Sequence, residues 1–168
     1  MKTETIENIF NFLNTKEGKE IPQTVLDFIA KEKFIQELEN HPDDVQYRYE
    51  GDLSLSGRNI TKLPNDLYVT GDLDLVHCKQ LTKLPDKLHV EGNLILENCN
   101  QLTKLPDNLY VKESLALDGA NITELPNNLY VGWNLYIYNT SLAKKYTDDE
   151  IREMITSKGG TIKARIIR

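Results

Sequence analysis

The chain has 168 residues, of which 39% are hydrophobic and 8% aromatic, so it is long and apolar enough to bury a core and is not a disordered polymer. Its 26 acidic and 20 basic residues leave a formal net charge of −6, which argues against binding nucleic acid through a basic surface. No stretch approaches the roughly 20 consecutive apolar residues of a membrane span, so we expect neither nucleic acid nor a membrane as a direct partner.

Residues 1–50 carry 11 acidic and 6 basic residues and have the periodicity of helices. Apolar residues recur at helical spacing in two groups, Ile6, Ile9, Phe10 and Leu13, followed by Val25, Phe28, Ile29, Ile35 and Leu38. Gly18 and Pro22 separate the groups, and proline suits the first turn of a helix. We therefore expect two helices in this segment, whose first residues lack the apolar centre of a signal peptide.

Residues 51–145 repeat themselves. Aligned on each other, the copies read GDLSLSGRNITKLPNDLYVT, GDLDLVHCKQLTKLPDKLHV, EGNLILENCNQLTKLPDNLYV, KESLALDGANITELPNNLYV and the partial GWNLYIYNTSL. The first leucines of the L-x-L units are spaced by 20, 21, 21 and 20 residues: Leu53, Leu73, Leu94, Leu115 and Leu135. A period near 20 is typical of a solenoid, in which each coil stacks only on its neighbours.

Residues 146–168 leave the repeat pattern. In YTDDEIREMI, Thr147 and Glu150 form a predicted capping box at the start of a helix, and Gly159 with Gly160 ends it. TIKARII then alternates apolar and basic residues, as a half-exposed strand does. Because a stack of coils exposes leucines at both ends, we expect residues 1–50 to form a helical N-terminal cap and residues 146–168 a helix–strand C-terminal cap.

The unit L-x-L-x-x-(N/C/T)-x-(x)-L-T-x-L-P, over residues 51–142, resembles the leucine-rich repeat family in its short bacterial and phage form. The resemblance implies an α/β solenoid of about five parallel strands, one at each L-x-L, whose usual work is protein recognition. An L-x-V segment in each copy makes the gap between motifs longer than in secreted bacterial effectors with LPxLP repeats: Leu67–Val69, Leu88–Val90, Leu109–Val111 and Leu129–Val131. We expect a cytoplasmic protein of a bacterial or phage-infected cell, with secretion by a non-classical route as an open alternative.

Cys78 and Cys99 fall at one position of the repeat, in register with Arg58, Ala120 and Thr140. In the family that the chain resembles, this position is often a buried Asn or Cys that serves the turn. A zinc site or a redox pair is the alternative, but the one histidine nearby in sequence is expected to face away from Cys78. Two cysteines also suit a reducing compartment. We therefore expect buried, reduced thiols, and neither a metal nor a cofactor.

The residues between the inward leucines point outward from the predicted strands and form one surface, named here the L-x-L face. By coil they are Asp52, Ser54 and Ser56; Asp72, Asp74 and Val76; Asn93, Ile95 and Glu97; Ser114, Ala116 and Asp118; and Asn134, Tyr136 and Tyr138. The L-x-L face holds five carboxylates and no lysine or arginine, and Asp52 and Asp72 would lie on adjacent strands, where facing like charges are unfavourable. It is either a solvated sheet surface or an acidic recognition surface for a basic partner; a calcium site would lack its loop motif.

Ten residues of the L-x-L face make up the candidate partner-binding site: Asp52, Asp72, Asp74, Val76, Asn93, Ile95, Glu97, Asp118, Tyr136 and Tyr138. The two tyrosines are aromatic anchors of the kind found in binding hot spots, unless the C-terminal segment covers them. Trp133, the only tryptophan, stands where earlier copies have Gly71 and Gly92, and we expect it to pack under that segment.

Catalysis requires a nucleophile or an acid–base pair whose partners converge. The three histidines, His41, His77 and His89, lie at unrelated positions, and none of the common catalytic motifs is present. We therefore predict a non-enzymatic module that binds another protein with a basic surface, in the form of an inhibitor encoded by a phage or mobile element. The alternatives are a secreted bacterial effector that binds host proteins and a self-assembling component that forms a homodimer through its C-terminal strand.

Overall fold

The computed structural model describes Ile29, residues 33–42 and residues 44–168. The chain divides into two compact units, Met1–Asn40 and His41–Arg168. No helix within the described part of the chain is long and apolar enough to cross a membrane.

The first unit is described only in part. Residues 33–39 are helical and bury Leu38, as the apolar spacing predicts. The expected first helix and the turn at Pro22 lie outside the described residues. The role of this unit as an N-terminal cap therefore stays a prediction.

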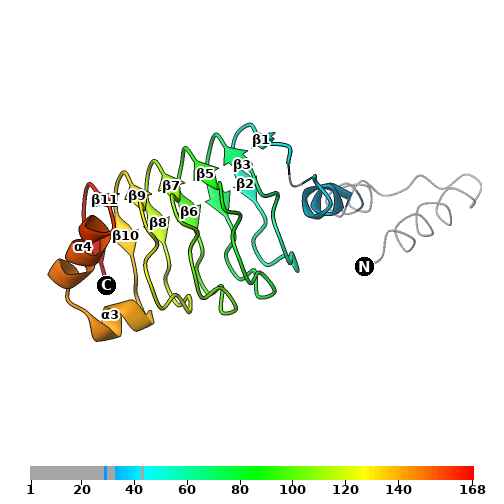
Figure 1. Ribbon diagram of the computed structural model, residues 1–168. Helices are drawn as coiled ribbons and strands as arrows, with labels where there is room; N and C mark the ends of the chain where they lie inside the picture. Colours follow the sequence, from blue (N-terminus) through cyan, green and yellow to red (C-terminus); the bar gives the residue numbers. More distant parts are fainter. Residues whose placement is uncertain (1–28, 30–32, 43) are drawn as a thin grey trace, which may run out of the picture. The chain divides into compact units, whose positions relative to one another are not determined.

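The second unit is a parallel β-solenoid with repeats of about 21 residues, and its coils stack side by side (Figure 1). Each coil contributes one short strand to each of two six-stranded parallel sheets. In spatial order, sheet A contains β1 (Tyr47–Tyr49), β3 (Leu67–Val69), β5 (His89–Val90), β7 (Tyr110–Val111), β9 (Tyr130–Val131) and β11 (Thr161–Ile162). Sheet B contains β2 (Leu53–Ser54), β4 (Leu73–Asp74), β6 (Leu94–Ile95), β8 (Leu115–Ala116), β10 (Leu135–Tyr136) and β12 (Ile166–Ile167).

Sheet A is the main departure from the expected α/β solenoid of about five strands. The L-x-V segments form it, because their spacing from the L-x-L units is constant and brings them into register in successive coils. Tyr68 thus pairs with His89, and Val69 pairs with Val90. The strands of sheet A occupy the side of the coil where an α/β solenoid would place helices, so the repeats are β-structure on both sides.

The first strand of sheet A comes from the segment that was expected to be helical. Tyr47–Tyr49 forms β1, in register with Leu67–Val69 of β3. Tyr47 precedes Leu53 by the same distance as Leu67 precedes Leu73, so the phase of the repeat already extends upstream of residue 51. The first coil lacks the L-x-V letters, and this hid the strand.

Leucine and valine side chains from both sheets fill the interior. In sheet B, Leu94 pairs with Leu73 on one side and Leu115 on the other, and all three are fully buried. In sheet A, Val90 pairs with Val111, and both are fully buried as well. Full burial of such a side chain contributes about 1.5–3 kcal/mol. One coil alone would leave one side of its leucines in water, so the sequence repeats until a different segment covers the end.

The turn after each sheet B strand requires a residue with left-handed backbone conformation. His77 and Asn98 have φ of 57°, and the equivalent residues Gly57, Gly119 and Asn139 have φ of 69°, 67° and 59°. Glycine and asparagine adopt this conformation at low cost, which explains their recurrence and leaves the histidine as the costlier choice.

The C-terminal segment forms a sixth coil. Its strands β11 and β12 pair with β9 and β10, so TIKARII is two short strands in different sheets and not one half-exposed strand. The hydrogen bond from Arg165 to Asn134 spans 31 residues, whereas the equivalent bond from Asn134 to Ser114 spans 20. The longer connection contains helices α3 (Ser141–Lys145) and α4 (Asp148–Ser157).

Helix α4 confirms the predicted capping signals. The side chains of Thr147 and Glu150 bond reciprocally to each other's backbone N–H at its start. Gly159, with φ of 77°, follows its end. Ile151 and Ile155 are buried, so the helix packs its apolar side against the last coil. The short helix α3, which begins after Thr140, was not predicted.

Candidate functional site

The L-x-L face is the outer surface of sheet B, and the structure extends it by one coil. Because Ile166 pairs with Leu135, the sixth coil adds Arg165 and Ile167 to this surface. The expectation of a face without basic residues is therefore wrong at its C-terminal edge, where Arg165 is exposed. The face still carries five carboxylates against this one arginine.

One row of the L-x-L face is a ladder of hydrogen bonds that joins each coil to the next. Asp52 Oδ1 accepts the backbone N–H of Asp72 at 2.8 Å, and Asp72 Oδ1 accepts that of Asn93 at 2.6 Å. Asn93 Oδ1 in turn accepts the N–H of Ser114 at 3.0 Å. Each of these short side chains carries an acceptor oxygen that the backbone N–H of the next coil reaches.

This ladder gives Asp52, Asp72 and Asn93 a structural role. The sequence predicted unfavourable repulsion between the two aspartates, but each carboxylate faces an N–H of the next coil, and such charge-assisted hydrogen bonds are stronger than neutral ones. The side-chain amide of Asn93 also donates to Asp72 Oδ1 at 3.0 Å and to Glu113 Oε2 at 2.9 Å. These three residues of the candidate site hold the register of the coils.

The central row of the L-x-L face changes its side chain in every coil. In register along sheet B it reads Ser54, Asp74, Ile95, Ala116, Tyr136 and Ile167. Asp74 is engaged within the sheet, because its carboxylate accepts the Ser54 hydroxyl and the half-buried Val76 N–H, both at 3.0 Å. The remaining members differ mainly in size, and this difference shapes the surface.

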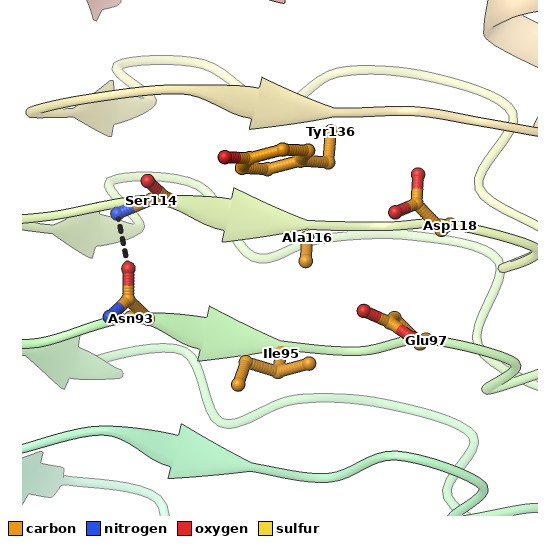
Figure 2. A pocket seen from close by; sticks show the side chains of 7 residues that line it. All are labelled: Asn93, Ile95, Glu97, Ser114, Ala116, Asp118 and Tyr136. Atoms are coloured by element: carbon orange, nitrogen blue, oxygen red, sulfur yellow. Dashed lines mark hydrogen bonds between the residues drawn. The ribbon is translucent and has the colours of Figure 1, made fainter. Parts of the chain in front are cut away.

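A hollow of about 330 Å³ lies at Ala116, the smallest side chain of the central row. Its lining residues are Asn93, Ile95, Glu97, Ser114, Ala116, Asp118 and Tyr136. Figure 2 shows Ile95 and Tyr136 as opposing walls with Ala116 between them. The carboxylates of Glu97 and Asp118 stand together at one end of the hollow (Figure 2). The structure thus brings five of the ten predicted site residues around one depression.

Among the described residues, no ion pair engages the two carboxylates at the end of the hollow. Asp118 Oδ1 accepts the backbone N–H of Tyr138 at 2.5 Å, which fixes the position of its side chain. The ion pairs found in the described part of the chain include neither Glu97 nor Asp118. Their negative charge therefore faces solvent next to two apolar walls.

Two aromatic side chains of the fifth coil are exposed. Tyr138 has 59% of its surface exposed and Trp133 has 65%. The prediction that Trp133 packs under the C-terminal segment is wrong, because the sixth coil continues the stack edge to edge: the N–H of Ala164 donates to the Trp133 carbonyl at 3.3 Å, and the outward side chain stays uncovered. Of the two predicted anchors, Tyr138 is open to solvent and Tyr136 is half-buried beside the hollow.

The outer face of sheet A is organised differently. Four rings, named here the aromatic stack, lie one on another: Tyr68, His89, Tyr110 and Tyr130. Successive ring centroids are 4.3, 4.2 and 4.7 Å apart, with interplanar angles of 7°, 12° and 4°. The guanidinium carbon of Arg48 lies 4.4 Å from the Tyr68 centroid, and Lys163 Nζ lies 5.3 Å from the Tyr130 centroid. The stack therefore has a cation at each end.

Glu91 joins the aromatic stack to a neighbouring lysine. Its carboxylate accepts the Tyr68 hydroxyl at 2.7 Å, the His89 Nε2–H at 2.8 Å and the Lys112 ammonium at 2.7 Å. These bonds, with Lys112 contributing most, lower the pKa of Glu91 to about 2. The Glu91 carboxylate is thus ionised at neutral pH, and it accepts three hydrogen bonds.

Cys78 and Cys99 are buried and free, as predicted. Burial, reinforced by the neighbouring Cys99, raises the pKa of Cys78 to about 12, and burial also raises the pKa of Cys99. A protonated buried thiol is a poor nucleophile and a poor metal ligand. No group of three or more potential metal ligands occurs within the part of the chain that the structure describes.

No protein-family model, no curated protein and no solved structure matches the chain. The functional proposal therefore depends on the geometry of the two sheet faces.

Proposed function

We propose that the protein is a non-enzymatic interaction module that binds another protein through the L-x-L face. The partner presents a basic surface, since the L-x-L face carries five carboxylates and one arginine. Complementary charge of this kind speeds association and selects among partners. In its most specific form, the module is an inhibitor encoded by a phage or mobile element that covers a basic surface of its target.

The hydrogen bonds of the cysteine position support assignment of the repeat to the leucine-rich type. Cys78 Sγ donates to the Leu55 carbonyl at 3.2 Å, and Cys99 Sγ donates to the Leu75 carbonyl at 3.0 Å. A buried donor thus satisfies a carbonyl of the preceding coil, as expected of the Asn or Cys that serves this turn in leucine-rich repeats. Proteins of that type use a strand face for recognition, which favours the L-x-L face over the rest of the surface.

The hollow at Ala116 is the observation that carries the proposal. Ile95 and Tyr136 supply apolar walls, and Glu97 with Asp118 supplies negative charge at one end. Binding hot spots combine an aromatic residue, a depression that excludes water and a charge to be matched by the partner. A sheet surface that is only solvated requires neither the depression nor the exposed Tyr138 beside it.

Charge reversal within the L-x-L face tests the proposal. Glu97→Lys is the chosen variant, because no hydrogen bond or ion pair of its carboxylate is found in the described residues and the fold does not depend on it. Glu153→Lys on the exposed side of α4 makes the same change of charge at a distance from the face. A protein captured from the native host by the wild-type chain would be purified and titrated against both variants.

We expect Glu97→Lys to weaken binding of the purified partner at least tenfold, with an unchanged melting temperature. Glu153→Lys should bind like the wild-type chain. Equal affinities for all three proteins would show that the partner contacts another surface and would refute the assignment to the L-x-L face.

A further inference from the structure

The walls of the hollow at Ala116 define a slot of limited width. Ile95 and Tyr136 extend from β6 and β10, which are separated by one strand, β8. Strands in a sheet are about 4.8 Å apart, so these two lie about 9.6 Å apart. Apolar groups pack at about 3.5–4.0 Å from their neighbours, and the slot therefore accepts a single flat or rod-like group between the Tyr136 ring and Ile95.

The hollow is large enough to receive one side chain of a docked protein. Its volume of about 330 Å³ is at the low end of the roughly 300–1,000 Å³ typical of small-molecule sites. It lies on the outer surface of sheet B, so a residue of a docked protein can enter it directly. Asn134 donates to the Tyr136 hydroxyl at 3.3 Å and orients that wall before any ligand arrives.

The charge at the end of the hollow selects a cationic group. Glu97 and Asp118 come from adjacent coils, and Asp118 is already held by the N–H of Tyr138 at 2.5 Å. Two carboxylates on neighbouring strands can accept hydrogen bonds from both edges of a planar guanidinium, which carries five donors in a fixed fork. The ammonium group of lysine is a compact, strongly hydrated charge. It fits the two carboxylates and the flat tyrosine ring less well than a guanidinium does.

A tyrosine ring, a guanidinium and a carboxylate already contact one another on sheet A. The Arg48 guanidinium lies 4.4 Å from the centroid of the Tyr68 ring. Its Nε donates to the carboxylate of Glu50 at 2.6 Å. Tyrosine, guanidinium and carboxylate are thus assembled from one chain on sheet A. The hollow on sheet B supplies a tyrosine and two carboxylates and lacks only the guanidinium.

We propose that the hollow lined by Ile95, Ala116 and Tyr136 is a binding site for an arginine side chain of the partner, with the guanidinium on the Tyr136 ring and between the carboxylates of Glu97 and Asp118. This inference rests on the proposed function, because it names the residue by which the basic partner is recognised. Arginine is also enriched among residues that dominate binding energy at interfaces.

A titration with single blocked amino acids tests the site without the partner. The ¹⁵N-labelled full chain is titrated with N-acetyl-arginine amide, and chemical shifts are followed at the backbone N–H groups of Glu97, Ala116 and Asp118. N-acetyl-lysine amide and N-acetyl-citrulline amide are the comparison probes; citrulline has the shape of arginine without its charge. We expect millimolar binding of the arginine probe, at least tenfold tighter than that of either comparison probe. The citrulline probe has no charge to form charge-assisted hydrogen bonds with the carboxylates, and the ammonium of the lysine probe forms fewer of them.

Two variants show where the arginine probe binds. Ala116→Leu fills the hollow from an outward-facing position and should abolish the shifts, and Glu97→Gln should weaken binding at least fivefold while the hollow keeps its shape. Glu153→Gln on α4 is the matched control and should bind the arginine probe like the wild-type chain. The spectrum of each variant without ligand reports whether it is folded. Equal binding of arginine and lysine, equal binding of arginine and citrulline, or shifts that persist in Ala116→Leu would overturn the proposal.

The two proposals fail in different ways. If no shift occurs in the hollow but Glu97→Lys still abolishes binding of the purified partner, the L-x-L face is the interface and the arginine site is refuted. If the arginine probe binds in the hollow but Glu97→Lys leaves partner binding unchanged, the proposed role of the hollow in recognising the partner is refuted.

Discussion

The outer faces of sheets A and B come from the same repeats but use their side chains in opposite ways. On sheet A, the four rings of the aromatic stack contact one another, a cation lies at each end, and Glu91 accepts three hydrogen bonds. On sheet B, one row holds the register of the coils, while the central row leaves a hollow with two carboxylates that no cation of the described residues neutralises.

The difference follows from how strictly each position repeats. A stacked repeat places the same position of every coil side by side, so similar residues satisfy each other, as tyrosine and histidine do on sheet A. Where unlike residues alternate, as Ile95, Ala116 and Tyr136 do, neighbouring side chains leave space and unmatched charge. Repetition therefore stabilises the solenoid, and departure from it creates a place where another molecule can bind.

The largest expected effect comes from breaking the aromatic stack. Tyr110 contacts a ring on each side, with centroid distances of 4.2 and 4.7 Å. Each such pair contributes about 0.5–1.5 kcal/mol beyond its buried area, so Tyr110→Ala should lower the free energy of unfolding by about 2–3 kcal/mol. The free energy of unfolding is measured by urea denaturation, with circular dichroism as the signal. Tyr136→Ala on sheet B removes no ring stacking and should cost less; equal losses at the two positions would contradict the comparison.

An intermediate effect is expected within the L-x-L face, where structural and unpaired acids occur together. Asp72→Ala removes the acceptor of the Asn93 N–H and side-chain amide, and should lower the free energy of unfolding by about 1–2 kcal/mol. Asp72→Asn keeps an acceptor and should recover part of this loss. Glu97→Gln should stay within about 0.5 kcal/mol of the wild-type chain. A destabilisation by Glu97→Gln as large as that by Asp72→Ala would show that Glu97 is also structural.

The smallest effect concerns Glu91 and depends on pH. Its pKa in the folded protein, about 2, lies below the ordinary value of 4.5, so its contribution to stability is complete above about pH 4.5 and is lost as the pH falls toward 2. Glu91→Gln should lower the free energy of unfolding at pH 7 by about 1 kcal/mol. Between pH 4.5 and 2 the stability of the variant should decline less steeply than that of the wild-type chain.

Chemical denaturation at a series of pH values measures this difference. Glu124→Gln is the matched control, because Glu124 forms one ion pair, with Lys104, among the described residues and has 53% of its side chain exposed, compared with 24% for Glu91. The control should change the pH dependence less than Glu91→Gln does. Parallel pH profiles for wild type and Glu91→Gln would show that the three hydrogen bonds do not stabilise the folded state.

Features that depend on the repeat itself could be predicted from the sequence. The inward leucines, the buried position of Cys78 and Cys99, and the capping box at Thr147 and Glu150 all follow from local patterns that the structure confirms. The register of the central row also follows, because residues at one repeat position must lie side by side. Sheet A was missed because the family resemblance implied one strand in each coil, at the L-x-L unit, although the L-x-V segment recurs with the same spacing.

Features that depend on the space between side chains could not be predicted. The ladder through Asp52 and Asp72 looked like a row of repelling charges, since the sequence does not show that each oxygen reaches the next backbone N–H. The hollow requires the sizes of three neighbours together with the position of Asp118, which a bond to Tyr138 determines. The exposure of Trp133 depends on the sixth coil, whose two strands were read as one.

Trp133 also gives the molecule an optical reporter. It is the single tryptophan of the chain, it has 65% of its surface exposed, and it lies two residues before β10, the strand that supplies Tyr136. An indole in water emits at long wavelength, and the emission moves to shorter wavelength when water is removed from it. Unfolding changes the surroundings of this ring little, whereas a protein seated beside β10 covers it. Its fluorescence can therefore follow binding with no attached dye.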